Sequence, residues 1–159
     1  GRVAGAHRSV CVGRQRLARD AAGEPLEVGV ADPKGAIETG LYSALSTALG
    51  SSPLVYNSTA RVASLPYVVF QAAGGDDSQY HLKERGWIYR YQVLAVGTDR
   101  GDLVGYASTI DGALVRGTLT VTDWDVVRVE RAEPMDYVQT LEDGTWIFFV
   151  GGTYEIEVD

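Results

Sequence analysis

The side chains best suited to chemistry in this chain are two histidines and one cysteine. His7 and His81 lie far apart in the sequence, and neither stands in a pattern typical of a general base or a metal ligand, so we expect both to be solvated surface residues. Cys11 lies between Val10 and Val12, with no neighbouring residue that would act as a base. As the only cysteine it excludes an internal disulfide and a cysteine metal cluster.

Three close pairs of aspartates are the remaining candidates for a hard-cation site. They are Asp76 with Asp77, Asp99 with Asp102, and Asp123 with Asp125. None of the pairs has the alternating oxygen ligands and the distal glutamate of an EF-hand. The second pair is typical of a helix start, where carboxylates favour the positive end of the helix dipole, and the third is typical of the solvated face of a strand. We therefore expect no metal site.

The common catalytic spacings are also absent from the sequence. It contains no HExxH, CxxC or GxSxG motif, no P-loop and no GxGxxG. Trp87, Tyr89 and Tyr91 share one face of a predicted strand and could stack on a sugar or a base, but aromatic packing beneath a helix explains them better. The sequence thus predicts no catalytic residue, no cofactor and no enzyme.

The C-terminal third, residues 119–158, is predicted to form one long two-stranded antiparallel ribbon. Its residues alternate between two faces with the period of a strand, and the chain turns at residues 142–144. Asp-Gly between two apolar runs is a strong hairpin signal, because glycine tolerates the positive φ of such turns. Counting back from the turn places Gly151 and Gly152 opposite residues 133–134, which indicates a shared bulge or bend.

Two amphipathic helices are predicted upstream of the ribbon. The first has Asp32 as N-cap and Pro33 at the first helical position, and Gly50 ends it. The second begins at Asp99 or Asp102 and ends at Gly117. Apolar residues at helical spacing form their stripes: Ile37, Leu41, Ala44, Leu45, Ala48 and Leu49 in the first, and Leu103, Tyr106, Ala107, Ile110, Leu114 and Val115 in the second.

Three further strands are predicted, at residues 54–56, 66–70 and 87–98. The consecutive apolar residues of the second favour a strand that is covered on both faces. The second and third strands form a hairpin whose connection, residues 74–86, is unusually long. Loops of this length are often functional or mobile, and we expect this loop to be mobile in the free protein.

Together these elements predict one α+β domain over residues 35–159, with a mainly antiparallel sheet, two helices packed on one face and a long C-terminal β-ribbon. Residues 1–34 are predicted to be a basic arm that is either flexible or ordered by a neighbouring subunit. The arm carries six basic and four acidic residues, whereas residues 35–159 carry eight and seventeen. Such an acidic body argues against nucleic-acid reading, and no apolar run is long enough to span a membrane.

Candidate interaction residues lie in two places. The long loop carries Asp76, Asp77, Tyr80, His81, Lys83 and Arg85, and the ribbon turn carries Glu142 and Asp143. Charge at a rim acts on encounter and partner choice more than on stability. We therefore expect that reversing Glu142 and Asp143 to lysine leaves the fold intact and impairs joining to a partner.

Six stretches, in their order, carry a family resemblance over about residues 35–159. They are IETGLYSAL from Ile37, Val55-Tyr56, LPYVVF from Leu65, YRYQVL from Tyr89, the helix ending at Leu114, and GTYEIEV from Gly152. With these stretches in this order, the chain resembles the tail-terminator, or tail-completion, proteins of long-tailed phages. None of the stretches is a catalytic fingerprint.

The resemblance implies a structural protein that forms a homo-hexameric ring on the head-proximal end of the tail tube. Such a ring stops tube polymerisation and joins the tail to the head-completion or connector protein. DNA would pass through its lumen without specific binding, and the protein would be assembled in the host cytoplasm into the virion tail. The alternatives are another head-to-tail joining protein, or a small ligand-binding or enzymatic α+β domain whose pocket includes the aromatic face of residues 87–91.

Overall fold

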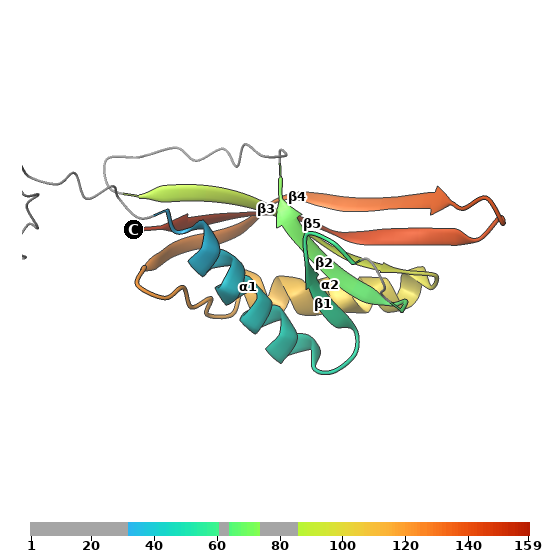
Figure 1. Ribbon diagram of the computed structural model, residues 1–159, viewed down its shortest axis with the longest axis horizontal. Helices are drawn as coiled ribbons and strands as arrows, with labels where there is room; N and C mark the ends of the chain where they lie inside the picture. Colours follow the sequence, from blue (N-terminus) through green and yellow to red (C-terminus); the bar gives the residue numbers. More distant parts are fainter. Residues whose placement is uncertain (1–31, 61–63, 74–85) are drawn as a thin grey trace, which may run out of the picture. The chain divides into compact units, whose positions relative to one another are not determined.

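The computed structural model describes residues 32–60, 64–73 and 86–159, which belong to the unit Asp32–Asp159. Its elements are, in order, α1 (Lys34–Leu49), β1 (Leu54–Asn57), β2 (Tyr67–Ala72), β3 (Trp87–Gly97), α2 (Arg100–Leu114), β4 (Val126–Thr140) and β5 (Trp146–Val158) (Figure 1). This confirms the predicted α+β class. Neither of the described helices has the length and apolarity needed to cross a membrane. The predicted basic arm lies almost entirely outside the described residues.

The five strands form one sheet in the order β1-β2-β3-β5-β4. β2 and β3 pair antiparallel, as do β3 with β5 and β5 with β4, so the predicted hairpins and the mainly antiparallel sheet are confirmed. β1 pairs with β2 in parallel, with Val55 opposite Val68. This parallel pair places α1 and β1 next to each other at one side of the sheet.

Both helices pack on the same face of the sheet, as predicted (Figure 1). Each contributes three fully buried side chains to the main core: Ile37, Leu41 and Leu45 from α1, and Leu103, Ile110 and Leu114 from α2. Two members of the predicted stripes, Ala48 and Val115, are exposed instead. α2 ends at Leu114 rather than at Gly117, so Val115 lies past the last helical turn that faces the sheet.

The starts of both helices follow from local hydrogen bonding. Asp99 is the N-cap of α2, and its Oδ1 accepts hydrogen bonds from the backbone N–H groups of Gly101 and Asp102. This satisfies donors that would otherwise have no partner in the first helical turn. At α1, Asp32 Oδ1 accepts from the Lys34 N–H at 2.9 Å, and Pro33 already has helical φ and ψ. The N-cap position is therefore occupied by Pro33, one residue later than predicted, and Lys34 is the first helical residue.

The ribbon begins later than predicted, at Val126 instead of residue 119. Leu119 and Val121 leave the end of α2 and are buried in the main core, and Trp124 donates its N–H to the Val121 carbonyl in a turn. β4 then carries a register shift between Val126 and Arg128. The predicted alternation over these residues is therefore wrong, because the shift turns Val127 outward, where it is 59% exposed.

The bend in the ribbon lies close to where the sequence places it. Gly152 pairs with Pro134, Gly151 pairs with Met135, and a second register shift follows at residues 131–133. A Cβ on Gly151 would lie 2.0 Å from the Val93 carbonyl oxygen of β3. Glycine at this position therefore permits the close approach of β3, with which Gly151 pairs at Leu94.

Candidate interaction surface

The candidate interaction surface is the face of the sheet that points away from the helices. Alternate residues of each strand point to this open face, and no helix of the described residues covers it (Figure 1). β2 was predicted to be covered on both faces. In fact Val68 and Phe70 face the core and are fully buried, whereas Tyr67 and Val69 on the open face are only partly buried.

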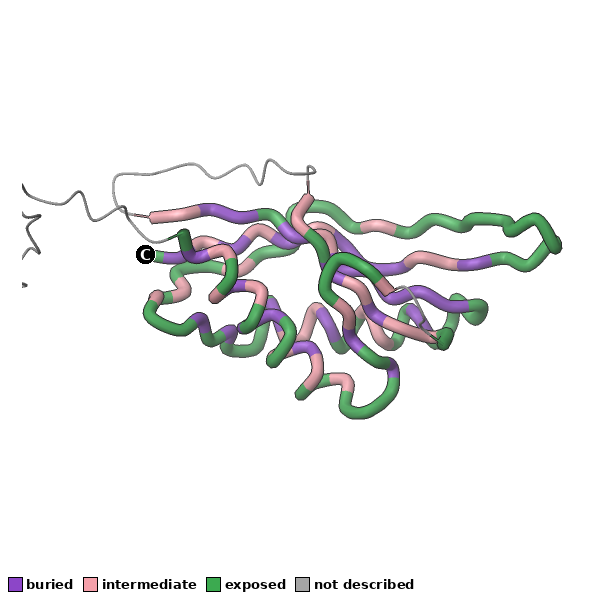
Figure 2. Tube along the Cα trace, in the orientation of Figure 1, coloured by how far each residue is buried: buried purple, intermediate pink, exposed green. Residues whose placement is uncertain are grey.

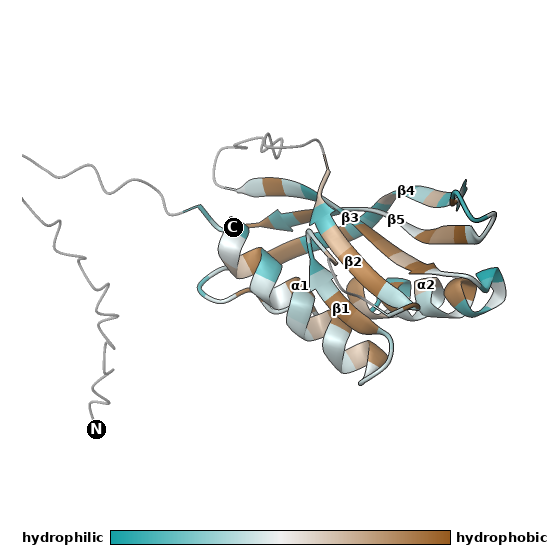
Figure 3. Ribbon diagram, turned by 45° about the vertical axis from the view of Figure 1, so that its right-hand side comes forward, coloured by the Kyte–Doolittle hydropathy of each residue, from teal (hydrophilic) through white to brown (hydrophobic). Residues whose placement is uncertain are grey.

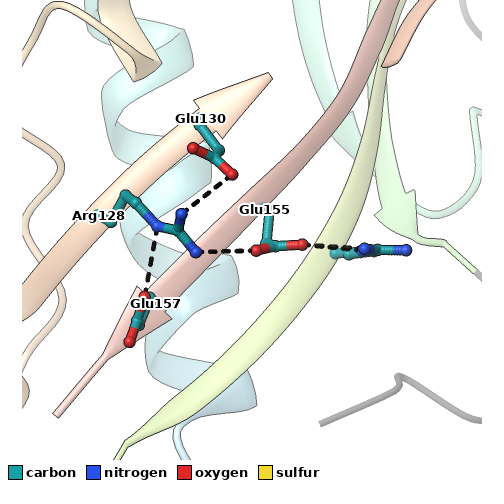
Figure 4. A network of polar contacts seen from close by, with 5 residues as sticks. Arg128, Glu130, Glu155 and Glu157 are labelled. Atoms are coloured by element: carbon teal, nitrogen blue, oxygen red, sulfur yellow. Dashed lines mark hydrogen bonds and ion pairs between the residues drawn. The ribbon is translucent and has the colours of Figure 1, made fainter. Parts of the chain in front are cut away.

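One half of the open face is a network of charged side chains (Figure 4). The Arg128 guanidinium contacts Glu130 at 3.2 Å, Glu155 at 3.1 Å and Glu157 at 3.3 Å, and Glu155 also contacts Arg90 at 3.0 Å. The side chains of Glu155 and Glu157 are 14% and 17% exposed. Single exposed ion pairs stabilise a fold little, but this shared arrangement fixes two arginines in a flat layer.

The other half of the open face is apolar. Leu94, Val96 and Ile147 are buried there in a second, smaller cluster, and Tyr67, Val69, Met135 and Phe149 pack against it. Two aromatic contacts extend this cluster towards its edges. Tyr56 meets Tyr67 edge to face, with ring centroids 5.9 Å apart, and Tyr137 stacks on Phe149 at 4.6 Å.

The apolar half continues along the β4–β5 hairpin to its turn (Figures 1 and 3). We call residues 137–149 of this hairpin the ribbon arm. Four large hydrophobic side chains of the ribbon arm are exposed: Tyr137 at 44%, Val138 at 52%, Leu141 at 43% and Trp146 at 61%. They lie on both faces of the arm, because Tyr137 pairs with Phe149 and Val138 pairs with Phe148. Figure 2 shows the β4 side of the arm and the turn as exposed, whereas the β5 side after Trp146 is buried or intermediate.

Local contacts keep the ribbon arm extended. The ladder continues to the pair of Thr140 with Trp146, and Trp146 meets Phe148 edge to face with centroids 6.5 Å apart. At the base of the arm, Arg100 in the first turn of α2 forms an ion pair with Asp136. These contacts limit the movement of the arm, and such preorganisation lowers the entropy cost of binding a partner.

The tip of the arm is the predicted turn. The Gly144 N–H donates to the Leu141 carbonyl, and Gly144 has a φ of 82°. Glu142 and Asp143 are both exposed there. However, Asp143 Oδ1 accepts a hydrogen bond from the Thr145 N–H at 2.8 Å, and this bond lowers the pKa of Asp143 below its ordinary value. Asp143 therefore has a structural role in the turn that the sequence prediction did not include.

The remaining predicted site residues divide into two groups. Asp76, Asp77, Tyr80, His81, Lys83 and Arg85 lie outside the described residues, as do His7 and Cys11. Asp123 and Asp125 do not lie on the face of a strand as predicted, because both precede β4 and Asp123 has a φ of 66° in the turn before it. Within the described parts of the chain, no three His, Cys, Asp or Glu side chains are grouped to hold a metal ion.

The grooves of the described unit bear on the alternative that the protein has a ligand pocket. A groove of about 310 Å³ between α1 and α2 is lined by small side chains, among them Gly40, Ser43, Thr47 and Ala113. None of its lining residues is ionisable. The aromatic face of residues 87–91 does not line this groove, because Tyr89 and Tyr91 are buried in the main core. Their predicted role in packing is confirmed.

The exposed apolar residues of the ribbon arm are the feature that the sequence reasoning missed. A sequence signal for them exists, since Trp146 to Val150 is an uninterrupted run of five hydrophobic residues. A ribbon with one face on a core requires alternation, so an uninterrupted run indicates that both faces of the ribbon contact something apolar.

Comparison with known proteins bears on the fold. No family model and no curated protein matches the sequence. Among solved structures, the chain is similar to a chain in the virion of a native gene transfer agent particle. The two are 14% identical, the match covers 79% of this chain and 96% of the other, and the TM-score is 0.53. The described unit therefore shares its fold with a component of a virion particle.

Proposed function

We propose that this protein is a structural component of a phage or phage-derived virion, and that it acts as a tail terminator. In this role it forms a homo-hexameric ring on the head-proximal end of the tail tube. The ring stops tube growth and joins the tail to the head connector. The protein has no enzymatic role in this proposal, and its partners are copies of itself, the tube protein and the connector protein.

The observation that carries the proposal is the ribbon arm together with the apolar half of the open face. Exposed hydrophobic side chains that are continuous with a partly covered cluster are typical of protein interaction surfaces. The edge strand β4 has fifteen residues and no partner strand among the described residues on its outer side. Long edge strands and apolar arms are suited to assembly and are a liability in a monomer. The fold shared with a virion component supports the same class of function.

The charge of the chain is also compatible with a ring through which DNA passes. Residues 1–31 carry five basic and three acidic residues, which leaves nine basic and eighteen acidic residues from Asp32 onward. Phosphate binding depends on clustered basic side chains. Two of the basic residues on the open face, Arg90 and Arg128, are already paired with glutamates. DNA would therefore meet a surface that does not retain it.

The test is to examine the full chain alone and with preformed tubes of its cognate tube protein. Light scattering and negative-stain electron microscopy are expected to detect closed rings of about six subunits, either free or on one end of each tube, and tubes that carry a ring are expected to stop lengthening. A strict monomer at high concentration, together with bare tube ends, would contradict the proposal.

The same experiment separates a terminator from another head-to-tail joining protein. A terminator binds the tube end in the absence of any head component. A protein that belongs to the connector instead would bind purified connector rings and leave the tubes to grow. The tube length distribution with and without the full chain therefore decides between the two.

A further inference from the structure

The two ends of β4 lie at opposite ends of the described unit (Figure 1). Val126 begins the strand beside the C-terminal residues of β5, and Thr140 ends it at the ribbon tip. Fifteen residues of extended chain place these ends about 45 Å apart. No side chain at one end can therefore reach the other end of the same molecule.

The ribbon tip combines apolar and acidic groups. Leu141 and Trp146 are 43% and 61% exposed, on either side of the turn that carries Glu142 and Asp143. An aspartate carboxylate is charged at neutral pH, and the hydrogen bond from the Thr145 N–H lowers the pKa of Asp143 further. The tip thus presents two hydrophobic side chains next to two negative charges, held by the hydrogen bonds of the turn.

A groove at the other end has the complementary chemistry. It has a volume of about 190 Å³ and lies between the segment after α2 and the start of β4, where its lining includes Val115, Leu119 and Val127. Val115 and Val127 are 39% and 59% exposed, and none of the lining residues is acidic. Arg116 follows Val115, is exposed, and forms no ion pair with any described residue.

We propose that the ribbon tip of one copy of this chain docks in the groove of the next copy. Leu141 and Trp146 would pack on Val115 and Val127, and the acidic turn would lie against Arg116. The inference rests on the ring proposed above and specifies which surfaces close it. We assign a second copy as the occupant because its tip carries apolar side chains that match the apolar lining of the groove. The tip also carries negative charge that complements Arg116.

The positions of the two surfaces also match the symmetry of a ring. A contact between different patches is heterologous, and repeating it head to tail generates a closed ring when the rotation between copies closes. A contact between two ribbon tips would be isologous and would stop at a dimer. The distance between tip and groove within one chain excludes an internal contact, so occupation of the groove by a tip always joins two copies.

Cysteine cross-linking tests this contact directly. The full chain with Cys11→Ser provides the background, and Leu141→Cys and Val127→Cys are introduced singly and together. Under mild oxidation only the double variant is expected to give a ladder of covalent oligomers that ends at the ring. A covalent dimer of the Leu141→Cys variant alone would show a contact between tips and overturn the inference. Rings that form normally in the double variant without cross-links would overturn it too, while leaving the proposed function intact.

A charge exchange gives an independent readout. Glu142→Arg and Arg116→Glu are each expected to weaken assembly by about tenfold, because a like-charge contact replaces an attractive one, and the double variant is expected to recover assembly. Glu133→Arg and Lys34→Glu are matched controls on β4 and α1 and are expected to assemble like the parent chain. Single variants that assemble normally, or a double variant without recovery, would overturn the inference. Absence of rings in the parent chain, alone and on tubes, would overturn both the inference and the proposed function.

Discussion

Three buried tyrosines on the helix-covered face of the sheet each donate a hydrogen bond to a carboxylate. The pairs are Tyr89 with Asp32 at 2.6 Å, Tyr91 with Glu38 at 3.3 Å, and Tyr154 with Asp111 at 3.3 Å. Glu38 belongs to α1, Asp32 precedes the start of α1, and Asp111 belongs to α2. A buried phenol requires a hydrogen-bond partner, so these contacts fix the position of both helices on the sheet.

The first prediction concerns alkaline pH. Burial, and then the neighbouring carboxylate of Glu38, raises the pKa of Tyr91 far above its ordinary value near 10, and burial and Asp111 do the same for Tyr154. The unfolded chain loses these protons near pH 10 while the folded chain keeps them. The contribution of these tyrosines to the free energy of unfolding is therefore fully present below pH 10. Above pH 10 the free energy of unfolding falls by about 1.4 kcal/mol per pH unit for each tyrosine. Urea unfolding measured on both sides of pH 10 checks this slope.

Tyr91→Phe isolates one of the two groups. At neutral pH the variant is expected to lose about 1 kcal/mol of unfolding free energy, because a buried hydrogen bond to a carboxylate is removed. Above pH 10 its stability should fall less steeply than that of the parent chain, by about 1.4 kcal/mol per pH unit. Tyr42→Phe is the control, since Tyr42 is 52% exposed. Equal slopes for Tyr91→Phe and the parent chain would contradict the assignment.

At the scale of elements, the sequence predicts what local chemistry determines. Asp99 caps α2 and Gly144 adopts a positive φ in the ribbon turn, and both follow from side chains within three residues. The parallel pairing of β1 with β2 and the bulge at Val127 depend on contacts between distant segments, so no local pattern contains them. The sequence predicts this site only at its acidic tip, because strand alternation alone does not indicate the exposed apolar side chains of the ribbon arm.

The packing of α1 gives a second prediction. Gly40 is buried in α1, and a Cβ there would lie 2.4 Å from the Thr120 backbone oxygen. Gly40→Ala is therefore expected to destabilise the fold by about 2 kcal/mol, although alanine is the better helix former. Gly105→Ala in α2 is the control, because its Cβ would meet nothing within 4 Å, and it is expected to stabilise by about 0.5–1 kcal/mol. Thermal unfolding that ranks the two variants in the opposite order would show that α1 does not pack this closely.

The ribbon turn gives a third prediction and revises the expectation that either sign is tolerated there. Asp143→Lys removes the acceptor of the Thr145 N–H and is expected to loosen the turn, whereas Asp143→Asn keeps an oxygen in the same place. Hydrogen exchange at Thr145 and Leu141 should accelerate in the lysine variant and stay near the parent rate in the asparagine variant. Equal protection in both variants would show that the side chain does not hold the turn.

At the scale of the whole molecule, the described unit has unlike faces and unlike ends. One face of the sheet is covered by two helices, and the other presents a charged half and an apolar half. One end of β4 carries an acidic, apolar tip, and the other borders a groove next to Arg116, which forms no ion pair with the described residues. Unlike ends favour head-to-tail assembly. Unlike faces allow a ring to bind a tube on one side while the other side offers no binding surface for a further tube subunit.

The last prediction follows from the distribution of charge. From Asp32 onward the chain carries twice as many acidic as basic residues, and binding to duplex DNA requires basic side chains that release counterions from phosphates. The full chain is therefore expected to leave the anisotropy of a labelled duplex unchanged, even at about 50 mM salt, where such binding is strongest. The five arginines of residues 1–31 provide the internal comparison. If salt-sensitive binding occurs and disappears when those arginines are replaced by glutamine, the DNA contact belongs to residues 1–31. If binding persists in this variant, it contradicts a lumen that releases DNA.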